Sequence, residues 1–175
     1  MFWSETAQKA MYIAKFFAKR SQYTTVNSGH VLAALHNVDY VGLFGGLLDE
    51  LGIYAKKVLE NIDQTNFPKN CNVDQSWDLS WTLGAVQVTK IAPQKAAMLN
   101  HPTVSTGHLL LAICDSRMAD LQGVPGDVPD EHTLLAAEII GQLGASTYKV
   151  EKQTLKIFDI KGKILKKVNS CILDL

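Results

Sequence analysis

The sequence has no excess of charge of either sign: 17 of its 175 residues are Lys or Arg and 17 are Asp or Glu. A chain without a net field lacks the electrostatic footprint by which proteins collect nucleic acid or anionic membrane surfaces. We therefore expect no nucleic acid and no membrane among its partners. Apolar residues make up 47% of the chain, which is ordinary for a globular protein with a core.

Cysteine is scarce, and its spacing excludes its common structural uses. Cys71, Cys114 and Cys171 lie too far apart to form a metal-binding motif, and any disulfide would leave one thiol over. This usage is typical of a reducing compartment. We interpret Cys114 as a small core residue and Cys71 as a candidate redox-sensitive thiol.

Long apolar runs and targeting signals are also missing. The longest clean apolar run, residues 109–114, is far too short to cross a bilayer. The first residues lack a basic stretch followed by an apolar one, as a secretory signal would have. We expect a cytoplasmic protein, or one in the plastid stroma if a transit peptide has been removed.

The sequence contains no motif for covalent or nucleotide chemistry. It lacks the Gly-x-x-x-x-Gly-Lys-Ser/Thr phosphate loop and the Gly-x-Ser-x-Gly nucleophile turn. Its histidines, cysteines and carboxylates show no metal-ligand spacing. We predict that the chain is not an enzyme, with no catalytic residue, metal or cofactor.

What the sequence does contain is a repeat. Residues 24–35 read Thr-Thr-Val-Asn-Ser-Gly-His-Val-Leu-Ala-Ala-Leu, and residues 102–113 read Pro-Thr-Val-Ser-Thr-Gly-His-Leu-Leu-Leu-Ala-Ile. At the same 78-residue offset, Trp3 matches Trp81 and Ala7 matches Ala85. Similarity at one fixed period marks a duplicated structural unit.

Apolar residues recur at three- and four-residue steps and predict helices in both copies. In the first copy the helices cover about 4–20, a segment from 28, 43–51 and 54–63; in the second they begin near 82, 106, 132 and 146. We predict N-caps at Ser4, Ser28, Thr82 and Thr106. Gly52 should end a helix in the left-handed conformation, and Pro93 should kink or split its helix.

The repeats also set the domain boundaries. We assign residues 1–155 to one double-repeat domain, with repeat one at about 2–63, a linker at 64–78 and repeat two at about 79–155. Pairing Leu51-Gly52 with Leu143-Gly144 changes the offset to 92 and implies a loop insertion at 116–130. Residues 156–175 form a C-terminal extension. Its apolar spacing slightly favours a helix, and a hairpin is the alternative.

The pattern Trp3-Ser4-x-x-Ala7, then Val26-x-Ser28-Gly29-His30-x-Leu32, recurs from Trp81 to Leu110. It resembles the double Clp N-terminal motif, the substrate- and adaptor-docking domain of Clp-type AAA+ unfoldases, over residues 2–155. The resemblance implies an all-α fold of two pseudo-symmetric four-helix repeats in one eight-helix bundle. It implies Clp unfoldase or Clp protease core subunits, adaptor proteins or client polypeptides as partners.

The resemblance also implies four binding positions, namely Ser4, Gly29, Thr82 and Gly107. Family members that read phosphoarginine use a Glu where this chain has Gly29 and Gly107, so the carboxylates that pair with a guanidinium are missing in both copies. On this basis we do not expect phosphoarginine recognition. Because Ser4 and Thr82 keep the hydroxyls, Glu at both glycine positions is predicted to restore it.

Histidines and aromatic residues admit two interpretations each. His30 and His108 have no further ligand three or four residues away, so a paired structural role is favoured over metal binding or acid–base chemistry. His36, His101 and His132 are predicted at the surface or in loops. Five aromatic residues either line a groove for apolar client segments or pack in the core, and we expect one or two of them to be exposed. The five are Trp3, Phe44, Phe67, Trp77 and Trp81.

Three kinds of function stay open. The first is a non-catalytic accessory protein of a Clp system, favoured over an excised N-terminal domain of an unfoldase by the Met1 start and the extra tail. The second is an enzyme or small-ligand binder with a pocket at the seam between the repeats. The third is an assembly factor that binds the protease rings without touching clients.

Overall fold

The structure is a computed structural model that describes residues 2–40, 42–65, 69, 79–115 and 135–173, with side chains as far as residue 162. These ranges hold eight helices and four two-residue strands, so the predicted all-α double repeat is confirmed. The first-repeat elements are β1 (Phe2–Trp3), α1 (Glu5–Arg20), β2 (Thr25–Val26), α2 (Ser28–Val38), α3 (Leu43–Glu50) and α4 (Ala55–Asp63). The second-repeat elements are β3 (Ser80–Trp81), α5 (Leu83–Met98), β4 (Thr103–Val104), α6 (Thr106–Ile113), α7 (Leu135–Gln142) and α8 (Thr147–Leu173).

The short strands pair between the repeats rather than within them. Strand β1 pairs in parallel with β4, and β2 pairs in parallel with β3. The Ser4 amide donates to the Val104 carbonyl oxygen at 2.8 Å, and the Thr82 amide donates to the Val26 carbonyl oxygen at 2.9 Å. The two contacts are equivalent, because Ser4 corresponds to Thr82 and Val26 to Val104 at the 78-residue offset. Each repeat therefore provides one strand to each of the two strand pairs. The strands were not predicted, because two residues cannot show the alternation that reveals a strand.

Two of the four predicted N-caps are confirmed and two are wrong by one residue. Ser4 Oγ accepts a hydrogen bond from the Ala7 amide at 3.2 Å, and Thr82 Oγ1 accepts one from the Ala85 amide at 3.3 Å. The caps of the other two helices are one residue earlier than Ser28 and Thr106; they are Asn27 and Ser105.

Ser28 instead links the repeats. Its buried side chain accepts a hydrogen bond from the Ala136 amide of α7, with Oγ and N 3.2 Å apart. Since Asn and Ser are equally good caps, the sequence alone could not choose between adjacent cap residues.

The left-handed backbone conformations that follow helix C-termini also occur in both repeats. Gln22 and Asn100 have positive φ angles of 62° and 55° at the 78-residue offset. Gly52 and Gly144 have φ angles of 72° and 83° at the 92-residue offset, which confirms the left-handed helix end predicted at Gly52. Asn visits this conformation more readily than most side chains, because its short polar group bonds locally.

Helix α5 contains Pro93 and is continuous from Leu83 to Met98, so the predicted split is wrong. The proline removes one backbone hydrogen bond. Its neighbours Ile91, Ala92 and Ala96 are buried on the side that faces the core. Packing on both sides of the proline therefore holds the helix together.

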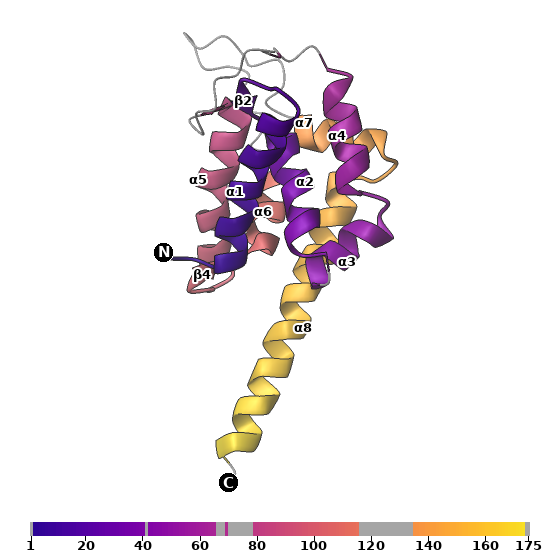
Figure 1. Ribbon diagram of the computed structural model, residues 1–175. Coiled ribbons are helices and arrows are strands. Elements are labelled where there is room, and N and C mark those ends of the chain that lie inside the picture. Colours follow the sequence, from indigo (N-terminus) through magenta and orange to yellow (C-terminus); the bar gives the residue numbers. More distant parts are fainter. Residues whose placement is uncertain (1, 41, 66–68, 70–78, 116–134, 174–175) are drawn as a thin grey trace.

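The core lies where α2 and α6 cross the middle of the molecule (Figure 1). Every residue of α6 is buried, as is every residue of α2 from Ser28 to His36. Helices buried on all sides are apolar all round, as these are. Helix α1 packs against α2 with fully buried small residues that let the two backbones approach closely; they are Ala7, Ala10, Ala14 and Ala18.

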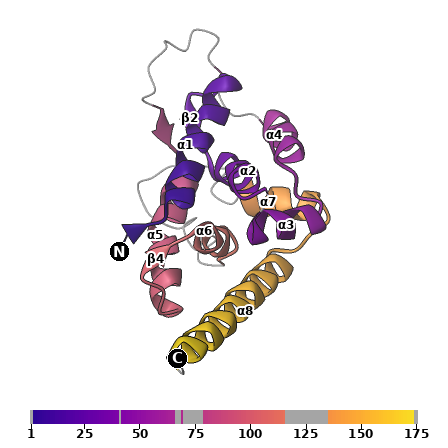
Figure 2. The ribbon, with the colours of Figure 1, turned by 60° about the horizontal axis from the view of Figure 1, so that its bottom comes forward.

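Helix α8 is one helix of 27 residues, about 40 Å long at the standard rise. This helix excludes the hairpin alternative for the tail. It also continues without a break through residue 155, the predicted end of the double-repeat domain. Its first half packs against the bundle, and its second half projects away from it (Figures 1 and 2). Nζ of Lys95 in α5 lies 3.6 Å from Glu151 Oε1 of the packed half, and it also lies 2.9 Å from Asp115 Oδ2, beyond the end of α6.

Several predicted features lie outside the described residues. These are the loop insertion at 116–130, most of the linker at 64–78, and the side chains of Phe67, Cys71, Trp77, His132 and Cys171. In the described ranges, no single helix has the length and apolarity to cross a membrane; α2 and α3 match by length and composition only as a pair bent by 113°.

Candidate functional site

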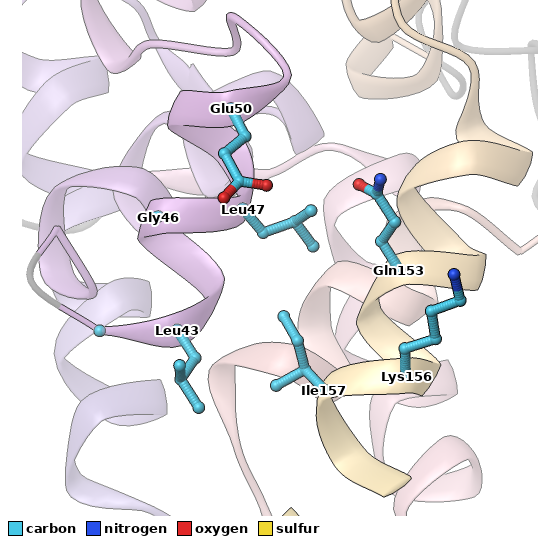
Figure 3. Close-up of a pocket in the computed structure, with 8 residues that line it drawn as sticks. Leu43, Gly46, Leu47, Glu50, Gln153, Lys156 and Ile157 are labelled. Atoms are coloured by element: carbon cyan, nitrogen blue, oxygen red, sulfur yellow. The ribbon is translucent and has the colours of Figure 1, made fainter. Parts of the chain in front are cut away.

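A groove of about 390 Å³ separates α3 from α8 (Figure 3), and we call it the α3–α8 groove. Helix α3 belongs to the first repeat and α8 to the second, so the groove lies at the seam between the repeats. Its volume falls within the range of small-ligand and side-chain pockets. The lining residues are Gly42, Leu43, Gly46, Leu47, Glu50, Gln153, Lys156 and Ile157.

The α3 wall owes its shape to the spacing of two leucines around a glycine. Leu43 and Leu47 are one helical turn apart and project from the same face. Gly46 stands beside them without a side chain, and a Cβ atom placed there would meet nothing within 4 Å. Leu43 is 53% exposed, which is unusual for leucine and leaves an apolar edge open to solvent. Glu50 lies one turn further along, at the end of this wall.

The α8 wall is formed by Gln153, Lys156 and Ile157, which share one face of the helix. Ile157 points toward the leucines of α3, whereas the ammonium group of Lys156 points away from α3 (Figure 3). The amide oxygen of Gln153, Oε1, is buried and has no hydrogen-bond partner among the described residues. A buried acceptor without a donor is uncommon in folded proteins and indicates a missing partner.

Two phenylalanines behind the groove hold its walls together. Phe44 of α3 and Phe158 of α8 have ring centroids 5.2 Å apart at an interplanar angle of 51°, a favourable tilted arrangement. Both are buried, so Phe44 is a core residue and not part of a client groove. Gly107 of α6 lies against both rings; a Cβ atom at this position would overlap Phe44 and lie 2.6 Å from Phe158 Cζ.

The glycines of the predicted binding positions are thus packing positions. Gly29 is enclosed less tightly than Gly107, since a Cβ atom there would lie 2.9 Å from Ile62 Cδ1. A glutamate at either position would have to displace packed side chains. That Glu at both positions restores phosphoarginine binding stays a prediction. The hydroxyls of Ser4 and Thr82 are engaged as caps, and none of the four positions lines the α3–α8 groove.

His30 and His108 occupy the same place in each repeat. Each is the third residue of its helix, and each Nδ1 accepts a hydrogen bond from the amide of the N-cap residue: Asn27 at 3.2 Å and Ser105 at 2.8 Å. Each histidine therefore accepts the hydrogen bond from the N-cap amide that a Glu or Gln side chain accepts in a standard capping box. Because Nδ1 accepts, the neutral ring carries its proton on Nε2.

The two repeats differ in what faces this Nε2 proton. In the second repeat His108 Nε2 lies 2.8 Å from Nδ1 of His101, which is half-buried. At the equivalent position the first repeat has Tyr23, whose ring lies 5.2 Å from His30 between centroids, and His30 Nε2 has no hydrogen-bond partner among the described residues.

Burial keeps both rings neutral. It lowers the pKa of His30 to about 3, and burial together with His101 lowers the pKa of His108 to about 4. Within the described part of the chain, no three His, Cys, Asp or Glu side chains gather as a metal site. Both histidines serve the helix starts in this structure.

One other prediction about a side chain needs correction. His36 is buried rather than at the surface: its Nε2 lies 2.7 Å from Asp49 Oδ1, and its ring contacts Tyr40 and Tyr54. Of the aromatic residues singled out in the sequence, Trp3 and Trp81 are half-buried. Cys114 is buried as predicted, and burial raises the pKa of its thiol to about 12.

The α3–α8 groove combines leucine and isoleucine side chains with one carboxylate, one ammonium group and one amide. Among the described residues that line it there is no His, Cys, Ser or Thr. The sequence suggested a pocket at the seam between the repeats but none of the residues that line this groove, because they come from two segments about a hundred positions apart and carry no motif.

Comparison with known proteins gives one family and one fold. The model of the Clp repeat (R) N-terminal domain matches residues 3–122. The Hsp104 N-terminal domain from Candida albicans has a TM-score of 0.65 at 16% identity, covering 90% of this chain and 91% of that one. The N-terminal domain of the ClpD chaperone from Arabidopsis thaliana has a TM-score of 0.64 at 16% identity, covering 90% and 94%.

A third structure, from an investigation of a malarial protein secretion system, has a TM-score of 0.61 at 18% identity. It covers 92% of this chain and 95% of that one. No curated protein sequence matches the chain. At these identities the solved structures establish the shared fold.

Proposed function

Because the chain belongs to the Clp repeat (R) N-terminal domain family, we propose that it is a non-catalytic protein-binding module of a Clp AAA+ chaperone or protease system. Family membership over most of the double repeat is the observation that carries this proposal. The module acts by reversible docking of Clp unfoldase or protease core subunits, adaptors or clients. The protein is then located in the compartment of its Clp partner, which is the cytoplasm or the plastid stroma.

The α3–α8 groove supports docking and not chemistry. It offers an apolar edge at Leu43 that is open to solvent, next to the apolar side chains of Leu47 and Ile157. The two histidines that a catalytic hypothesis would choose, His30 and His108, are engaged at helix starts. A small-molecule ligand at the seam is the competing use of the same groove.

Two forms of this function are open, a separate accessory protein and an N-terminal domain that continues into ATPase modules. Sequencing the complete transcript decides between them, since ATPase modules encoded downstream would contradict the accessory role.

The direct test is affinity capture from the native lysate, with the bound proteins identified by mass spectrometry. The bait is compared with Gly46→Trp, which fills the α3–α8 groove, and with Gly141→Trp on α7. Both glycines lie in helices with open space at Cβ, so both variants should fold. Clp subunits should be recovered by the parent and by Gly141→Trp, and in reduced amount by Gly46→Trp.

Absence of Clp subunits from all three captures would contradict the proposed function. Equal recovery by all three would place docking elsewhere on the molecule. Purified protease core then separates an assembly factor from a client-docking module, because only an assembly factor binds the core without an unfoldase.

A further inference from the structure

We propose that the α3–α8 groove receives a long basic side chain, best an arginine, presented by a bound polypeptide. This deepens the proposed function and rests on it in one respect, namely that the occupant belongs to a polypeptide. The inference comes from two groups on opposite walls of the groove that have no partner among the described residues: the Glu50 carboxylate, which forms no salt bridge there, and the buried amide oxygen of Gln153.

Besides Lys156, the polar side chains that line the groove are Glu50 and Gln153, and each offers an acceptor oxygen. Gln153 Oε1 is buried, lacks a donor among the described residues and is turned toward α3 (Figure 3). The Glu50 carboxylate lies on the opposite wall, is exposed and forms no salt bridge within the described ranges. A cationic donor between them would neutralise the carboxylate and supply the missing hydrogen bond. Such charge-assisted bonds are the stronger ones in proteins.

The floor between these groups fits the hydrocarbon part of a basic side chain. Leu47 and Ile157 face each other across it, and Gly46 leaves it open above. Lys and Arg place their methylene stems on apolar surface while their charged ends stay in polar surroundings. Arginine suits the site better, because its planar guanidinium donates in fixed directions to two acceptors at once.

Among the described residues, Lys156 is the one cation that lines the groove, so its position matters. Its ammonium group points away from α3 (Figure 3), which leaves the space between Glu50 and Gln153 free of it. It lies at the outer rim, where it could pair with a carboxylate beside the bound arginine.

The second seam of the molecule provides an internal comparison. At the 92-residue offset, Gly46 corresponds to Glu138 of α7 and Glu50 corresponds to Gln142. The second repeat therefore has a side chain in place of the open glycine and an amide in place of the carboxylate. Helix α4, which corresponds to the start of α8, ends at Asp63. The opening and the carboxylate therefore occur together in only one of the two seams that the structure describes.

The binding test is a titration of the full ¹⁵N-labelled chain followed by NMR. The probes are the blocked pentapeptide Ala-Leu-Arg-Leu-Ala and its analogues with citrulline or Glu in place of Arg. Citrulline keeps the shape of arginine without its charge. The Arg peptide should shift the amide signals of Gly46, Leu47 and Gln153, and the citrulline peptide should bind roughly tenfold more weakly, the effect of one charge-assisted hydrogen bond.

N-acetyl-arginine amide, titrated in parallel, separates a polypeptide from a free guanidinium compound. Weaker binding than the Arg peptide supports a polypeptide occupant, whereas equal binding contradicts it. Equal binding of the Arg and citrulline peptides, or tighter binding of the Glu peptide, overturns the basic-side-chain proposal. Absence of shifts with all peptides at millimolar concentration overturns it as well.

Variants assign the effect to named groups. Glu50→Gln and Gln153→Leu should each remove most of the preference for Arg over citrulline, and neither should lower the melting temperature, since neither group bonds within the described fold. Glu138→Gln, an exposed carboxylate at the other seam, is the matched control and should leave the preference unchanged. Equal behaviour of Glu50→Gln and Glu138→Gln would contradict the assignment.

Failure of this inference and failure of the proposed function are distinguishable. If Clp subunits are captured but the Arg preference is absent, the groove assignment is wrong and the Clp role stands. If the Arg preference is present but no Clp subunit is captured, the groove binds a basic side chain of some other polypeptide.

Discussion

Glycine has opposite roles at two positions around the α3–α8 groove. At Gly46 the missing side chain leaves open space, and at Gly107 it lets Phe44 and Phe158 meet. The first glycine shapes a surface, and the second is required by packing. The local sequence does not distinguish them, since both lie inside helices.

Alanine substitution at these two glycines should therefore change stability in opposite directions. Gly107→Ala overlaps two buried rings and should lower the free energy of unfolding by about 1–3 kcal/mol. Gly46→Ala adds a better helix former in open space and should raise it by about 0.5–1 kcal/mol. Urea unfolding followed by circular dichroism measures both, and a loss of stability in Gly46→Ala equal to that in Gly107→Ala would contradict this account.

The buried His30 predicts how stability depends on pH. Its pKa is lowered by burial from 6.5 to about 3, so between these values the unfolded chain binds a proton that the folded chain excludes. The contribution of His30 to the free energy of unfolding is therefore largest above pH 6.5, and it decreases as the pH falls below that value. From pH 7 to pH 5 the loss should be about 2 kcal/mol.

His30→Gln tests this assignment, because Gln can fill the same capping position without titrating. The urea midpoint of the variant should fall less steeply than that of the parent between pH 7 and pH 5. A parallel fall in the two proteins would mean that the pH dependence has another source.

At the scale of elements, Lys95 connects α8 to a buried ion pair between α5 and the residue that follows the end of α6. The side chains of Lys95 and Asp115 are only 15% and 5% exposed, and Lys95 also reaches Glu151 of α8. Removing one partner of such a group leaves an uncompensated buried charge, which costs far more than the pair contributes. Helix α8 forms one wall of the α3–α8 groove, so the contact between Lys95 and Glu151 helps to hold that wall in place.

Lys95→Met should lower the free energy of unfolding by about 3 kcal/mol and reduce hydrogen-exchange protection in α8 more than in α1. The matched control is Lys56→Met on α4, whose partner Glu60 is 3.8 Å away and whose side chain is 87% exposed. That exposed pair should contribute less than about 1 kcal/mol. Uniform loss of protection across the molecule in Lys95→Met would contradict a local role in holding α8.

At the scale of the whole molecule, the repeats form one folding unit. The strands pair only across repeats, and Ser28 of the first repeat accepts a hydrogen bond from Ala136 of the second. A single repeat would therefore expose its backbone ladder and the apolar faces of α2 or α6. Repeat units that cannot bury their apolar face alone need a neighbour to be stable.

We expect fragment 1–65 by itself to show no cooperative thermal unfolding. Mixed in equal amounts with fragment 79–175, it should regain helical signal and a cooperative transition, because the two fragments together restore both ladders. Circular dichroism with thermal melts provides the measurement. Cooperative unfolding of fragment 1–65 alone would show that the cross-repeat contacts are dispensable.

The sequence predicted those features that local patterns encode. Helix positions followed from apolar periodicity, the duplication from the 78-residue offset, and the left-handed exit at Gly52 from its single glycine. Cap positions were right at Ser4 and Thr82, where one good capping residue precedes the helix. They failed at Ser28 and Thr106, where two equally good capping residues stand side by side.

The sequence by itself determined the family, the double repeat and the all-α fold, because spacing and periodicity are properties of the chain. Only the tertiary structure decided the candidate site. Gly29 and Gly107, chosen by resemblance, became packing positions once Ile62, Phe44 and Phe158 lay against them. The groove arose instead where α3 and α8 meet, since contact between distant segments is set by how whole helices pack and leaves no local pattern to read.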